Sequence, residues 1–229
     1  MQPIQPIAMP GIHQRFLEYF KSEQLPTDAT ILDVGAGHGA FTQKLYQMGY
    51  PVSACDLFPE AFHFEPVVCK KVDVTAEFPY ADGAFQVVVA MEVAEHILDH
   101  ETFFGEINRI LAPGGVFYVS TPNILSLKSF LRFLLRGFFY SFEPLEMQNY
   151  NGLQHVVSRT VDQYNYIAIK HGFGPATIEI DKAQSTSRWL YVLLYPWIRF
   201  NAWLKKVPNV HNSYKLLTGR VLFLKFTKL

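Results

Sequence analysis

Short apolar runs alternate with amphipathic segments along the first half of the chain. Apolar residues at helical spacing predict a helix from Gly11 to Gln24, and the β-type run at residues 30–34 predicts a strand after it. The run at residues 85–91 is almost entirely apolar, as expected for a strand that is covered on both faces. Strands alternating with helices predict an α/β fold with a parallel sheet and right-handed crossovers.

The same patterns predict the remaining elements. Further helices are expected at residues 40–48, 101–111 and 160–170, and further strands at residues 52–56, 67–74, 116–120, 176–180 and 221–226. No internal repeat, low-complexity tract or long linker separates these elements. We therefore predict a single domain.

Composition supports a packed globular protein and bears on its compartment. A chain of 229 residues with 49% hydrophobic and 17% charged residues excludes disorder. Its only cysteines, Cys55 and Cys69, lie within predicted strands, which favours core residues in a reducing compartment over a disulfide framework. The chain shows no secretory signal and no apolar run of the ~18 residues that a spanning helix needs, so we expect a cytoplasmic protein.

A glycine-rich turn follows the first predicted strand. Residues 33–39 read DVGAGHG, and glycines at alternate positions let the backbone bend sharply and approach a ligand closely. Asp56 closes the next strand, where a carboxylate can accept both hydroxyls of a ribose. Together these features predict a nucleotide-type site. Asp33, two positions before the first glycine, would repel a phosphate but suits a cationic aminoacyl group.

These residues resemble those of class I S-adenosylmethionine-dependent methyltransferases. The resemblance runs from Ile31 to Asn123 and is carried by ILDVGAGHGAFT, the acid in VSACDLF, DVTAEFPYADGAFQVVVAMEVAEHI and EINRILAPGGVFYVSTPN. It implies a Rossmann-like, seven-stranded, mostly parallel sheet with strand order 3-2-1-4-5-7-6 and helices on both faces. It also implies S-adenosyl-L-methionine as the cofactor. Gln86 departs from the family pattern, which commonly has Asp after this Phe.

The resemblance further implies a set of cofactor-binding residues. These are Asp33, Gly35, Ala36, Gly37, His38, Asp56, Leu57, Asp73, Val74 and Met91. The acid and glycines of the turn would line the methionine moiety, Asp56 would hold the ribose, and Asp73 with Val74 would flank the adenine. His38 is unusual in such a turn and either contacts the cofactor carboxylate or faces solvent. The alternative is a tight turn of an ordinary α/β protein, with Asp56 as a helix cap.

On this basis the predicted single domain divides into four parts. Residues 1–29 would form an N-terminal helical cap, and residues 30–123 the cofactor-binding core. Residues 124–219 would carry insertions that face the substrate or a membrane, together with the sixth strand. Residues 220–229 would form the last strand.

Two carboxylates and an imidazole follow the fourth predicted strand. If a helical turn begins at Glu92, then Glu92, Glu95 and His96 share one face at the edge where such sheets bind substrates. This E-x-x-E-H run resembles that of ubiquinone-type O-methyltransferases and small-RNA 2′-O-methyltransferases, where the residues bind a metal. A later His, here His155, can join them. The resemblance thus implies catalytic roles for all four residues.

The hypothesis for these residues is a site for Mg²⁺ or another divalent cation. A bound cation would lower the pKa of an acceptor hydroxyl and leave an alkoxide or phenoxide opposite the sulfonium methyl. The alternative is that the carboxylates stabilise a helix N-terminus and that His96 acts structurally or as a general base without metal. Three ligands on one turn are fewer than a secure octahedral site needs.

Charge divides the chain into two halves. Residues 1–123 carry 15 acidic and 6 basic residues, whereas residues 124–229 carry 5 and 14, so a formal net charge of zero conceals the asymmetry. Residues 124–140 place Lys128, Arg132 and Arg136 at every fourth position of an otherwise apolar helix. Residues 188–206 combine all three tryptophans with a cationic rim.

Both segments have the pattern of an interfacial helix and predict peripheral contact with an anionic membrane. Cover of the sheet or of a partner subunit is the alternative, and the oligomeric state stays open. Nucleic acid is less consistent with the sequence, because the aromatic residues lie among Leu and Val rather than along a polar groove.

The function predicted from the sequence is methyl transfer from S-adenosylmethionine to an oxygen of a small apolar, lipid-linked or saccharide-type acceptor. N-methylation of a small molecule fits E-x-x-E-H less well, because an amine gains little from metal activation. A non-catalytic cofactor-binding or membrane-docking protein of the same fold is an alternative of another class. A nicotinamide-dependent oxidoreductase would require that cofactor to bind instead.

Overall fold

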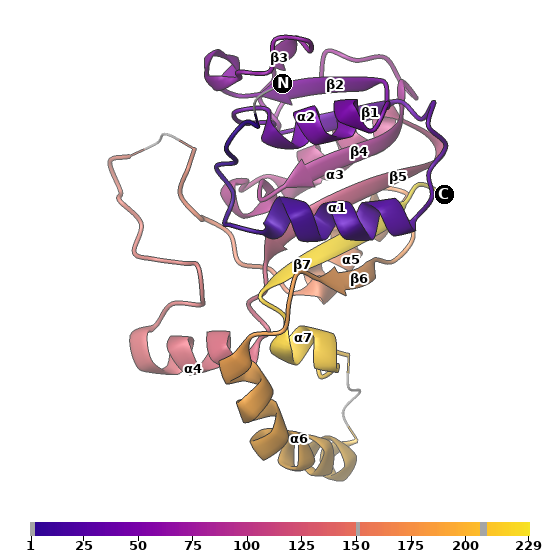
Figure 1. Cartoon of the computed structure of the whole chain (residues 1–229). Coiled ribbons are helices and arrows are strands. Elements are labelled where there is room, and N and C mark those ends of the chain that lie inside the picture. The colour runs from indigo at the N-terminus through magenta and orange to yellow at the C-terminus, as the bar shows by residue number, and fades with distance from the viewer. Residues whose placement is uncertain (1–2, 150–151, 207–209) are drawn as a thin grey trace.

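A computed structural model describes residues 3–149, 152–206 and 210–229. In this part of the chain, seven strands form one sheet with the order β3-β2-β1-β4-β5-β7-β6, which confirms the predicted order (Figure 1). The strands are β1 (Ile31–Val34), β2 (Val52–Asp56), β3 (Cys69–Lys71), β4 (Phe85–Met91), β5 (Leu111–Pro122), β6 (Thr177–Ile180) and β7 (Val221–Thr227). Only β7 runs antiparallel to its neighbours, β5 and β6.

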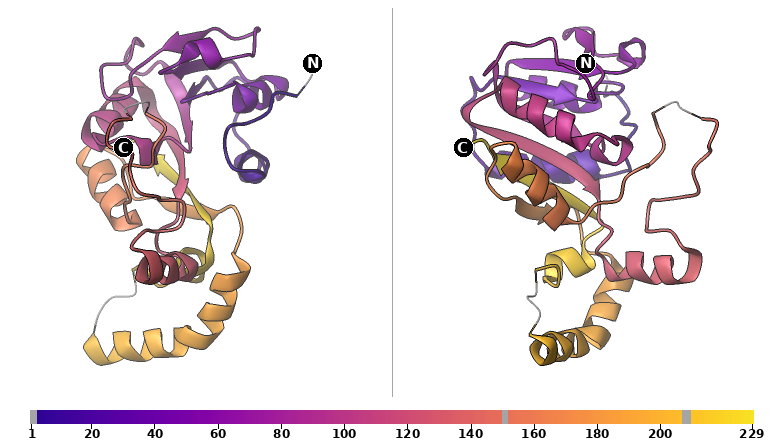
Figure 2. Two further views of the ribbon diagram at one scale, coloured as in Figure 1. Left: turned by 90° about the vertical axis from the view of Figure 1, so that its left-hand side faces the viewer. Right: turned by 180° about the vertical axis from the view of Figure 1, so that it is seen from behind.

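Helices cover both faces of the sheet. The helices are α1 (Ile12–Ser22), α2 (Ala40–Gln47), α3 (His100–Ile110), α4 (Leu127–Arg136), α5 (Val161–Lys170), α6 (Ser185–Lys205) and α7 (Tyr214–Thr218). Helices α1 and α2 lie on one face, and α3 and α5 lie on the other (Figures 1 and 2). This arrangement explains why the apolar run of β4 is buried almost throughout.

The strand registers bring the predicted site residues to one edge of the sheet. Val34, the last residue of β1, pairs with Cys55 of β2 and with Ala90 of β4. Because these strands are parallel, the turn after β1, the end of β2 and the end of β4 meet at the same edge. The topology therefore places Asp56 and Glu92 on either side of the glycine turn.

Two predicted strands differ from the observed ones. Residues 67–74 form only the short strand Cys69–Lys71, which pairs with β2 alone at the edge of the sheet. A strand at the edge of a sheet pairs on one side only, so the apolar residues that flank Cys69–Lys71 lie in the adjoining loops rather than in the strand. Strand β5 begins earlier than residue 116, because a register shift in its pairing with β4 admits the Pro113-Gly114-Gly115 segment.

Aromatic side chains dominate both halves of the core. On the α1 face, Phe16 packs edge-on against Tyr118 and Phe223 with ring centroids 5.7 and 5.2 Å apart. On the α3 face, Phe104 packs against Phe117 at 5.5 Å. Such edge-to-face pairs stabilise a core by more than their buried area alone. They fix the helices against the strands that carry the site.

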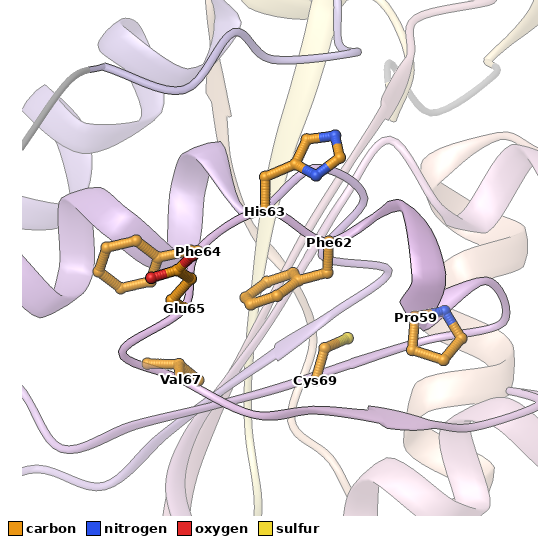
Figure 3. A pocket seen from close by; sticks show the side chains of 7 residues that line it. All are labelled: Pro59, Phe62, His63, Phe64, Glu65, Val67 and Cys69. Carbon is orange, nitrogen blue, oxygen red and sulfur yellow. The ribbon is translucent and has the colours of Figure 1, made fainter.

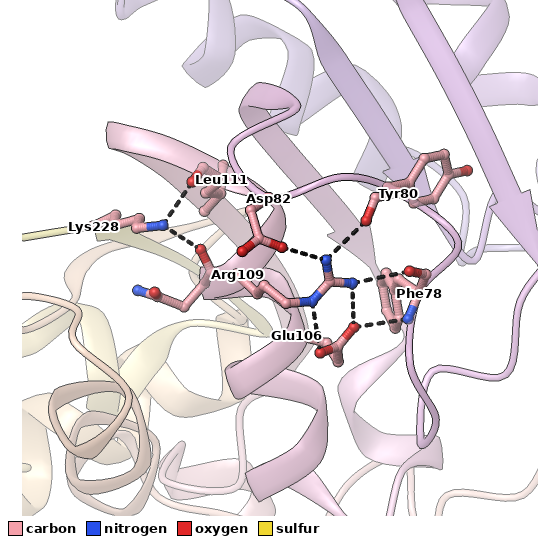
Figure 4. Close-up of polar contacts among 8 residues, drawn as sticks. Phe78, Tyr80, Asp82, Glu106, Arg109, Leu111 and Lys228 are labelled. Carbon is pink, nitrogen blue, oxygen red and sulfur yellow. Dashed lines mark hydrogen bonds and ion pairs between the residues drawn. The ribbon is translucent and has the colours of Figure 1, made fainter.

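A polar cluster attaches the segment before β4 to α3 (Figure 4). The Arg109 guanidinium donates to the Phe78 and Tyr80 carbonyls at 2.9 and 2.8 Å and pairs with Asp82 and Glu106. Glu106 in turn accepts from the Phe78 backbone N–H at 2.7 Å. The planar guanidinium thus satisfies several backbone groups of an irregular segment at once.

Helices α4 and α6 lie beyond one end of the sheet, and the short α7 packs between α6 and strand β6 (Figures 1 and 2). Helix α4 packs against α6, and α6 packs against α7. The predicted helix at 124–140 is shorter than expected, because Gly137 adopts φ 75° and ends it. Among the helices of the described chain, none combines the length and apolarity needed to cross a bilayer.

Candidate functional site

A cavity of about 1140 Å³ opens at the carboxyl edge of β1, β2 and β4. All ten residues predicted to bind the cofactor line it, and Glu92, His96 and His155 line it too. Its outer walls are the N-terminal segment 6–9 and the loop that follows α4, which the structure describes at residues 141–149 and 152–156. A volume at the upper end of the range for ligand pockets offers room for a cofactor and an acceptor together.

The glycine turn needs glycine for two separate reasons. Gly35 and Gly37 have φ values of 69° and 51°, a region that side chains disfavour. A Cβ on Gly35 would also lie 2.4 Å from Cγ2 of Val93, so the turn after β4 packs directly on the turn after β1. The glycines thereby let two loops approach each other beside the cavity.

Asp56 fixes the glycine turn from the neighbouring strand. Its Oδ2 accepts the Gly37 backbone N–H and its Oδ1 accepts the Phe58 N–H, both at 2.8 Å. Each carboxylate oxygen has a second lone pair, so both remain able to accept a ribose hydroxyl. The predicted ribose contact stays a prediction, while the structure adds an anchoring role that the sequence did not suggest.

Asp33 lies beneath the turn with only 2% of its surface exposed. Burial raises the pKa of its carboxyl to about 7, although the hydrogen bond from Thr42 acts in the opposite direction. The nearby charge of Asp56 raises it further. A buried carboxylate in this position favours a cationic ligand, because a positive charge restores the ionised form.

The remaining predicted cofactor residues lie around the same cavity. Leu57 is exposed at its rim, Met91 is buried at the end of β4, and Val74 is half-buried. The Asp73 carboxylate accepts the backbone N–H and the hydroxyl of Thr75 at 2.9 and 2.7 Å. His38 is half-buried, with Nδ1 3.4 Å from the Gln5 carbonyl, so it faces the N-terminal segment.

The prediction that a helical turn begins at Glu92 is wrong. Glu92 has φ 56°, in the left-handed region, and the following turn is a short 3₁₀ helix, η2 (Ala94–His96). Glu92 therefore does not share a helical face with Glu95 and His96. Its carboxylate instead accepts from the Ser120 hydroxyl at 3.2 Å, and burial raises its pKa to about 7. In this conformation the Glu92 backbone N–H donates to the Ser120 hydroxyl at 2.8 Å, and the next residue, Val93, packs against Gly35.

Glu95 is completely buried beneath the cavity. Neither of its carboxylate oxygens reaches hydrogen-bonding geometry with any described residue. Burial raises the pKa of this carboxyl well above its usual range, the charge of Glu92 adds to the effect, and the Thr121 side chain partly opposes it. An unsatisfied buried carboxylate is costly, and a cation is the usual partner of such a group.

His155 completes a three-residue group with Glu95 and His96. One ligand atom from each of the three lies within 4.8 Å of the others. The group combines residues up to 60 positions apart, because residues 152–156 lie against the turn after β4, where the Val156 N–H donates to the Glu95 carbonyl at 2.9 Å. Of the four residues predicted as one site, the structure gathers three and places Glu92 apart.

Hydrogen bonds orient both imidazoles. His96 Nδ1 lies 2.9 Å from the Gln154 carbonyl, which can only accept, so Nδ1 carries the proton and Nε2 the lone pair. His155 donates to the Ser141 backbone carbonyl and leaves Nδ1 buried without a partner among the described residues. Burial lowers the pKa of both rings, so both are neutral at physiological pH and able to act as ligand or base.

The N-terminal wall of the cavity was not predicted from the sequence. The Ile4 N–H donates to the Gln43 side chain at 3.0 Å, and Ile7 lies against the position of a Cβ on Gly37. His13 of α1 also lines the cavity, and its Nδ1 is buried without a described partner. Burial lowers the pKa of His13 to about 4. Only the apolar character of this segment hinted at its place.

A second, smaller hollow of about 480 Å³ lies beside the same loops (Figure 3). It is lined by residues of the segment between β2 and β3, including Pro59, His63 and Cys69. The Phe62 ring lies 2.8 Å from the position of a Cβ on Gly39, so this ring separates the hollow from the glycine turn. None of the predicted site residues lines it.

Comparison with known proteins gives the family. A family model described as a methyltransferase domain matches residues 8–174, well over half of the chain. The chain belongs to this family. The predicted class I S-adenosylmethionine-dependent methyltransferase is thereby confirmed, and S-adenosylmethionine is the cofactor of such proteins.

The methyltransferase domain has relatives with a named function. The chain is 30% identical over 129 residues to a ubiquinone biosynthesis O-methyltransferase of Paramagnetospirillum magneticum. The aligned part covers 52% of each of the two chains. It is 35% identical over 105 residues to the human mitochondrial enzyme of that name, covering 41% of this chain and 28% of the human one. The matched part spans about half, or less, of these relatives.

Solved structures confirm the fold. Phosphoethanolamine N-methyltransferase 2 of Haemonchus contortus, in complex with S-adenosyl-L-methionine, matches 97% of this chain and 54% of its own with a TM-score of 0.62 at 20% identity. An S-adenosylmethionine-dependent methyltransferase of Mesorhizobium loti matches 93% and 98% with a TM-score of 0.59 at 15% identity. Both comparisons agree with the Rossmann-like sheet predicted from the sequence.

Proposed function

We propose that this protein transfers a methyl group from S-adenosylmethionine to a hydroxyl oxygen of an apolar acceptor. The group Glu95, His96 and His155 at the edge of the cavity is the observation that carries the proposal. The cofactor would lie along the glycine turn and Asp56, with its methyl group directed toward the turn after β4. This places the acceptor between that turn and the loop 141–156.

The acceptor end of the cavity has an apolar lining with few polar groups. Leu98, Leu145 and Leu153 line it and are 72%, 40% and 62% exposed, so they offer surface for a ligand to cover. An apolar wall with a small polar centre favours an acceptor in which one hydroxyl is attached to a hydrophobic body. Relatives named ubiquinone biosynthesis O-methyltransferases support an acceptor of this kind.

A divalent cation fits the group of Glu95, His96 and His155. The buried, unsatisfied Glu95 oxygens and the two oriented imidazoles would hold it, and it would supply Lewis acidity that lowers the pKa of an acceptor hydroxyl. Two imidazoles and one carboxylate suit Zn²⁺, Fe²⁺ or Co²⁺ better than Mg²⁺, which prefers oxygen ligands. The donor set therefore favours one of these three cations over the Mg²⁺ named in the sequence-based hypothesis.

The residues of the chain supply the other requirements of transfer. Asp33 and the glycine turn orient the cationic end of the cofactor, and the loop 141–156 excludes water from the acceptor. The single Nε2 lone pair of His96 would hold the cation where one is bound, and without a cation it would instead take the hydroxyl proton. Methyl transfer then depends mainly on in-line positioning of oxygen, methyl carbon and sulfur.

Methyl transfer from labelled S-adenosylmethionine to a panel of apolar phenols and lipid-linked alcohols, with matched amines, tests the proposal. We expect labelled methyl ethers from the hydroxyl compounds and transfer that falls at least tenfold after exhaustive chelation. Transfer to the amines alone would contradict the O-methylation proposal. If chelation leaves methyl transfer to hydroxyls unchanged, the proposed cation is wrong but the proposed O-methylation stands.

We also propose peripheral contact with an anionic bilayer through residues 124–140 and 188–206. Leu134, Trp189 and Trp203 are 80%, 78% and 74% exposed, and the exposed cations Arg188, Arg199 and Lys205 lie along the same helix as the tryptophans. Exposed apolar residues with a basic rim support membrane contact, and a cytoplasmic protein would meet an anionic leaflet there.

Flotation with vesicles tests this contact. We expect the protein to float at low salt with vesicles containing phosphatidylserine, and less with pure phosphatidylcholine. Trp189→Ala together with Trp203→Ala should abolish flotation. A dimer in solution that buries the tryptophans, without flotation, would instead support the partner-subunit alternative.

A further inference from the structure

The basic stripe predicted on α4 does not face outward as a unit. Arg132 is turned inward, with 19% of its side chain exposed, and its Nη2 donates to the Phe142 carbonyl at 3.2 Å. The same guanidinium pairs with Glu143. Lys128 lies 4.4 Å from the ring centroid of Tyr140. Two of the three predicted membrane cations therefore bind the chain segment that returns from α4.

Other contacts between α4 and this return segment support the same conclusion. The buried Ser129 hydroxyl accepts the Tyr140 N–H at 2.9 Å. Phe133 stacks on Phe139 with ring centroids 4.6 Å apart. Hydrogen bonds, an ion pair and ring stacking thus fix residues 139–143 against one helix.

The fixed segment leads directly to the proposed active site. The Ser141 backbone, which adopts φ 73°, accepts the hydrogen bond from the His155 imidazole. The Phe142 ring packs edge-on against His155 at 5.5 Å, and His155 packs against His96 at 4.8 Å. Ser141 and Phe142 orient His155, and Arg132 binds the same segment at the Phe142 carbonyl and at Glu143.

We propose that Arg132 is a positioning residue, which sets the orientation of the His155 imidazole through residues 141–143. This inference rests on the proposed function for the role of His155. A left-handed, non-glycine residue such as Ser141 persists only where its surroundings determine its conformation. Arg132 supplies that determination, because its Nη2 donates both to the Phe142 carbonyl and to the Glu143 carboxylate.

The test compares Arg132→Gln with Arg132→Lys and with the exposed Arg136→Gln, one helical turn away. The His155 imidazole resonances, assigned with His155→Gln, report its orientation, and Co²⁺ binding to the protein reports the three-residue group. We expect Arg132→Gln to shift or broaden the His155 signals and to weaken Co²⁺ binding about tenfold, as losses of groups that orient metal ligands do. S-adenosylhomocysteine affinity should stay within about twofold of the parent.

The controls separate positioning from general destabilisation. Arg132→Lys should give an intermediate shift, since a lysine can keep one of the two contacts, and Arg136→Gln should match the parent. Unchanged His155 signals in a folded Arg132→Gln, or equal effects in both glutamine variants, would overturn the inference. If the parent binds no Co²⁺, the proposed cation fails, while the His155 resonances still decide the role of Arg132. If Arg132→Gln does not fold, Arg132→Lys and Phe142→Leu decide it by the same signals.

Discussion

The Thr42 hydroxyl on α2 donates a hydrogen bond of 2.6 Å to Oδ2 of Asp33 at the end of β1. This bond favours the ionised carboxylate, yet burial outweighs it and raises the Asp33 pKa to about 7. Near neutral pH the cofactor-free protein therefore exists both with and without a proton on Asp33. Several properties of the methyltransferase depend on this balance.

Cofactor binding is expected to release this proton. A cationic ligand above the turn favours the carboxylate, so the bound form has the lower Asp33 pKa, and affinity should rise with pH up to about 7 and then level off. Calorimetry at about pH 6 in two buffers of different ionisation heat measures the protons released. A pH-independent affinity without proton release would show that Asp33 does not respond to the cofactor.

Asp33→Asn should separate stability from binding. Because the folded pKa of Asp33 exceeds the unfolded value of 3.8, the wild-type protein loses stability as the pH rises from about 4 to about 7. The loss is at most about 4 kcal/mol, at 1.36 kcal/mol for each unit of pKa. At about pH 8 the variant should unfold at higher denaturant concentration and bind S-adenosylmethionine at least tenfold more weakly. Reduced stability of the variant at that pH would contradict this account.

Asp56→Ala should weaken cofactor binding more than Asp73→Ala does. Asp56 anchors Gly37 and is predicted to hold the ribose, so its loss removes charge-assisted hydrogen bonds worth about 2–3 kcal/mol, or 30- to 150-fold in affinity. The exposed Asp73 carboxylate bonds Thr75 and no other residue in the described part of the chain. Its removal should cost less than tenfold. Fluorescence titration with S-adenosylhomocysteine measures both, and equal losses would argue against the predicted role of Asp56.

Glu95→Gln should keep the protein folded and remove its cation site. The wild-type carboxyl has a raised pKa, so its contribution to stability declines as the pH rises above its unfolded value. The neutral amide removes this cost, so at about pH 8 the free energy of unfolding should equal or exceed that of the parent. Co²⁺ binding should fall at least tenfold. A stable variant that binds Co²⁺ as the parent does would exclude Glu95 as a ligand.

Arg109→Met is expected to lower the free energy of unfolding by about 2 kcal/mol. The change leaves Glu106 unpaired and two backbone carbonyls without their donor, although the partial exposure of the cluster moderates the cost. The matched control is Arg15→Met, whose ion pair with Glu18 is exposed and should contribute less than about 0.5 kcal/mol. Urea denaturation compares the two, and similar losses would show that the cluster is not stabilising.

Sequence patterns predicted most of the sheet because the signals for these elements lie in residues that are neighbours in the chain. The run at residues 85–91 coincides with β4, since a strand covered on both faces must be apolar throughout. The helix predicted at residues 160–170 begins with a capping box between Thr160 and Gln163, which is itself a local signal. The short edge strand β3 was predicted too long, because pairing on one side only is not visible in the sequence.

The candidate site was predictable in its members but not in its geometry. The glycine turn and the acids at strand ends indicated which residues line the cavity, and parallel pairing brought them to one edge. The left-handed backbone of Glu92 lies next to Val93, which packs against Gly35 in a contact between loops 58 residues apart. No helical periodicity encodes such a contact.

The sequence by itself determined the order of elements, the chemistry of the glycine turn and the family to which the chain belongs. Each of these follows from neighbours in the chain and from residue types. The structure brings the predicted His155 together with Glu95 and His96, but tertiary structure alone decided that Glu92 lies outside this group and that Arg132 points inward to the loop carrying His155. Those outcomes depend on packing between distant segments, where burial and the geometry of single contacts determine which side chains meet.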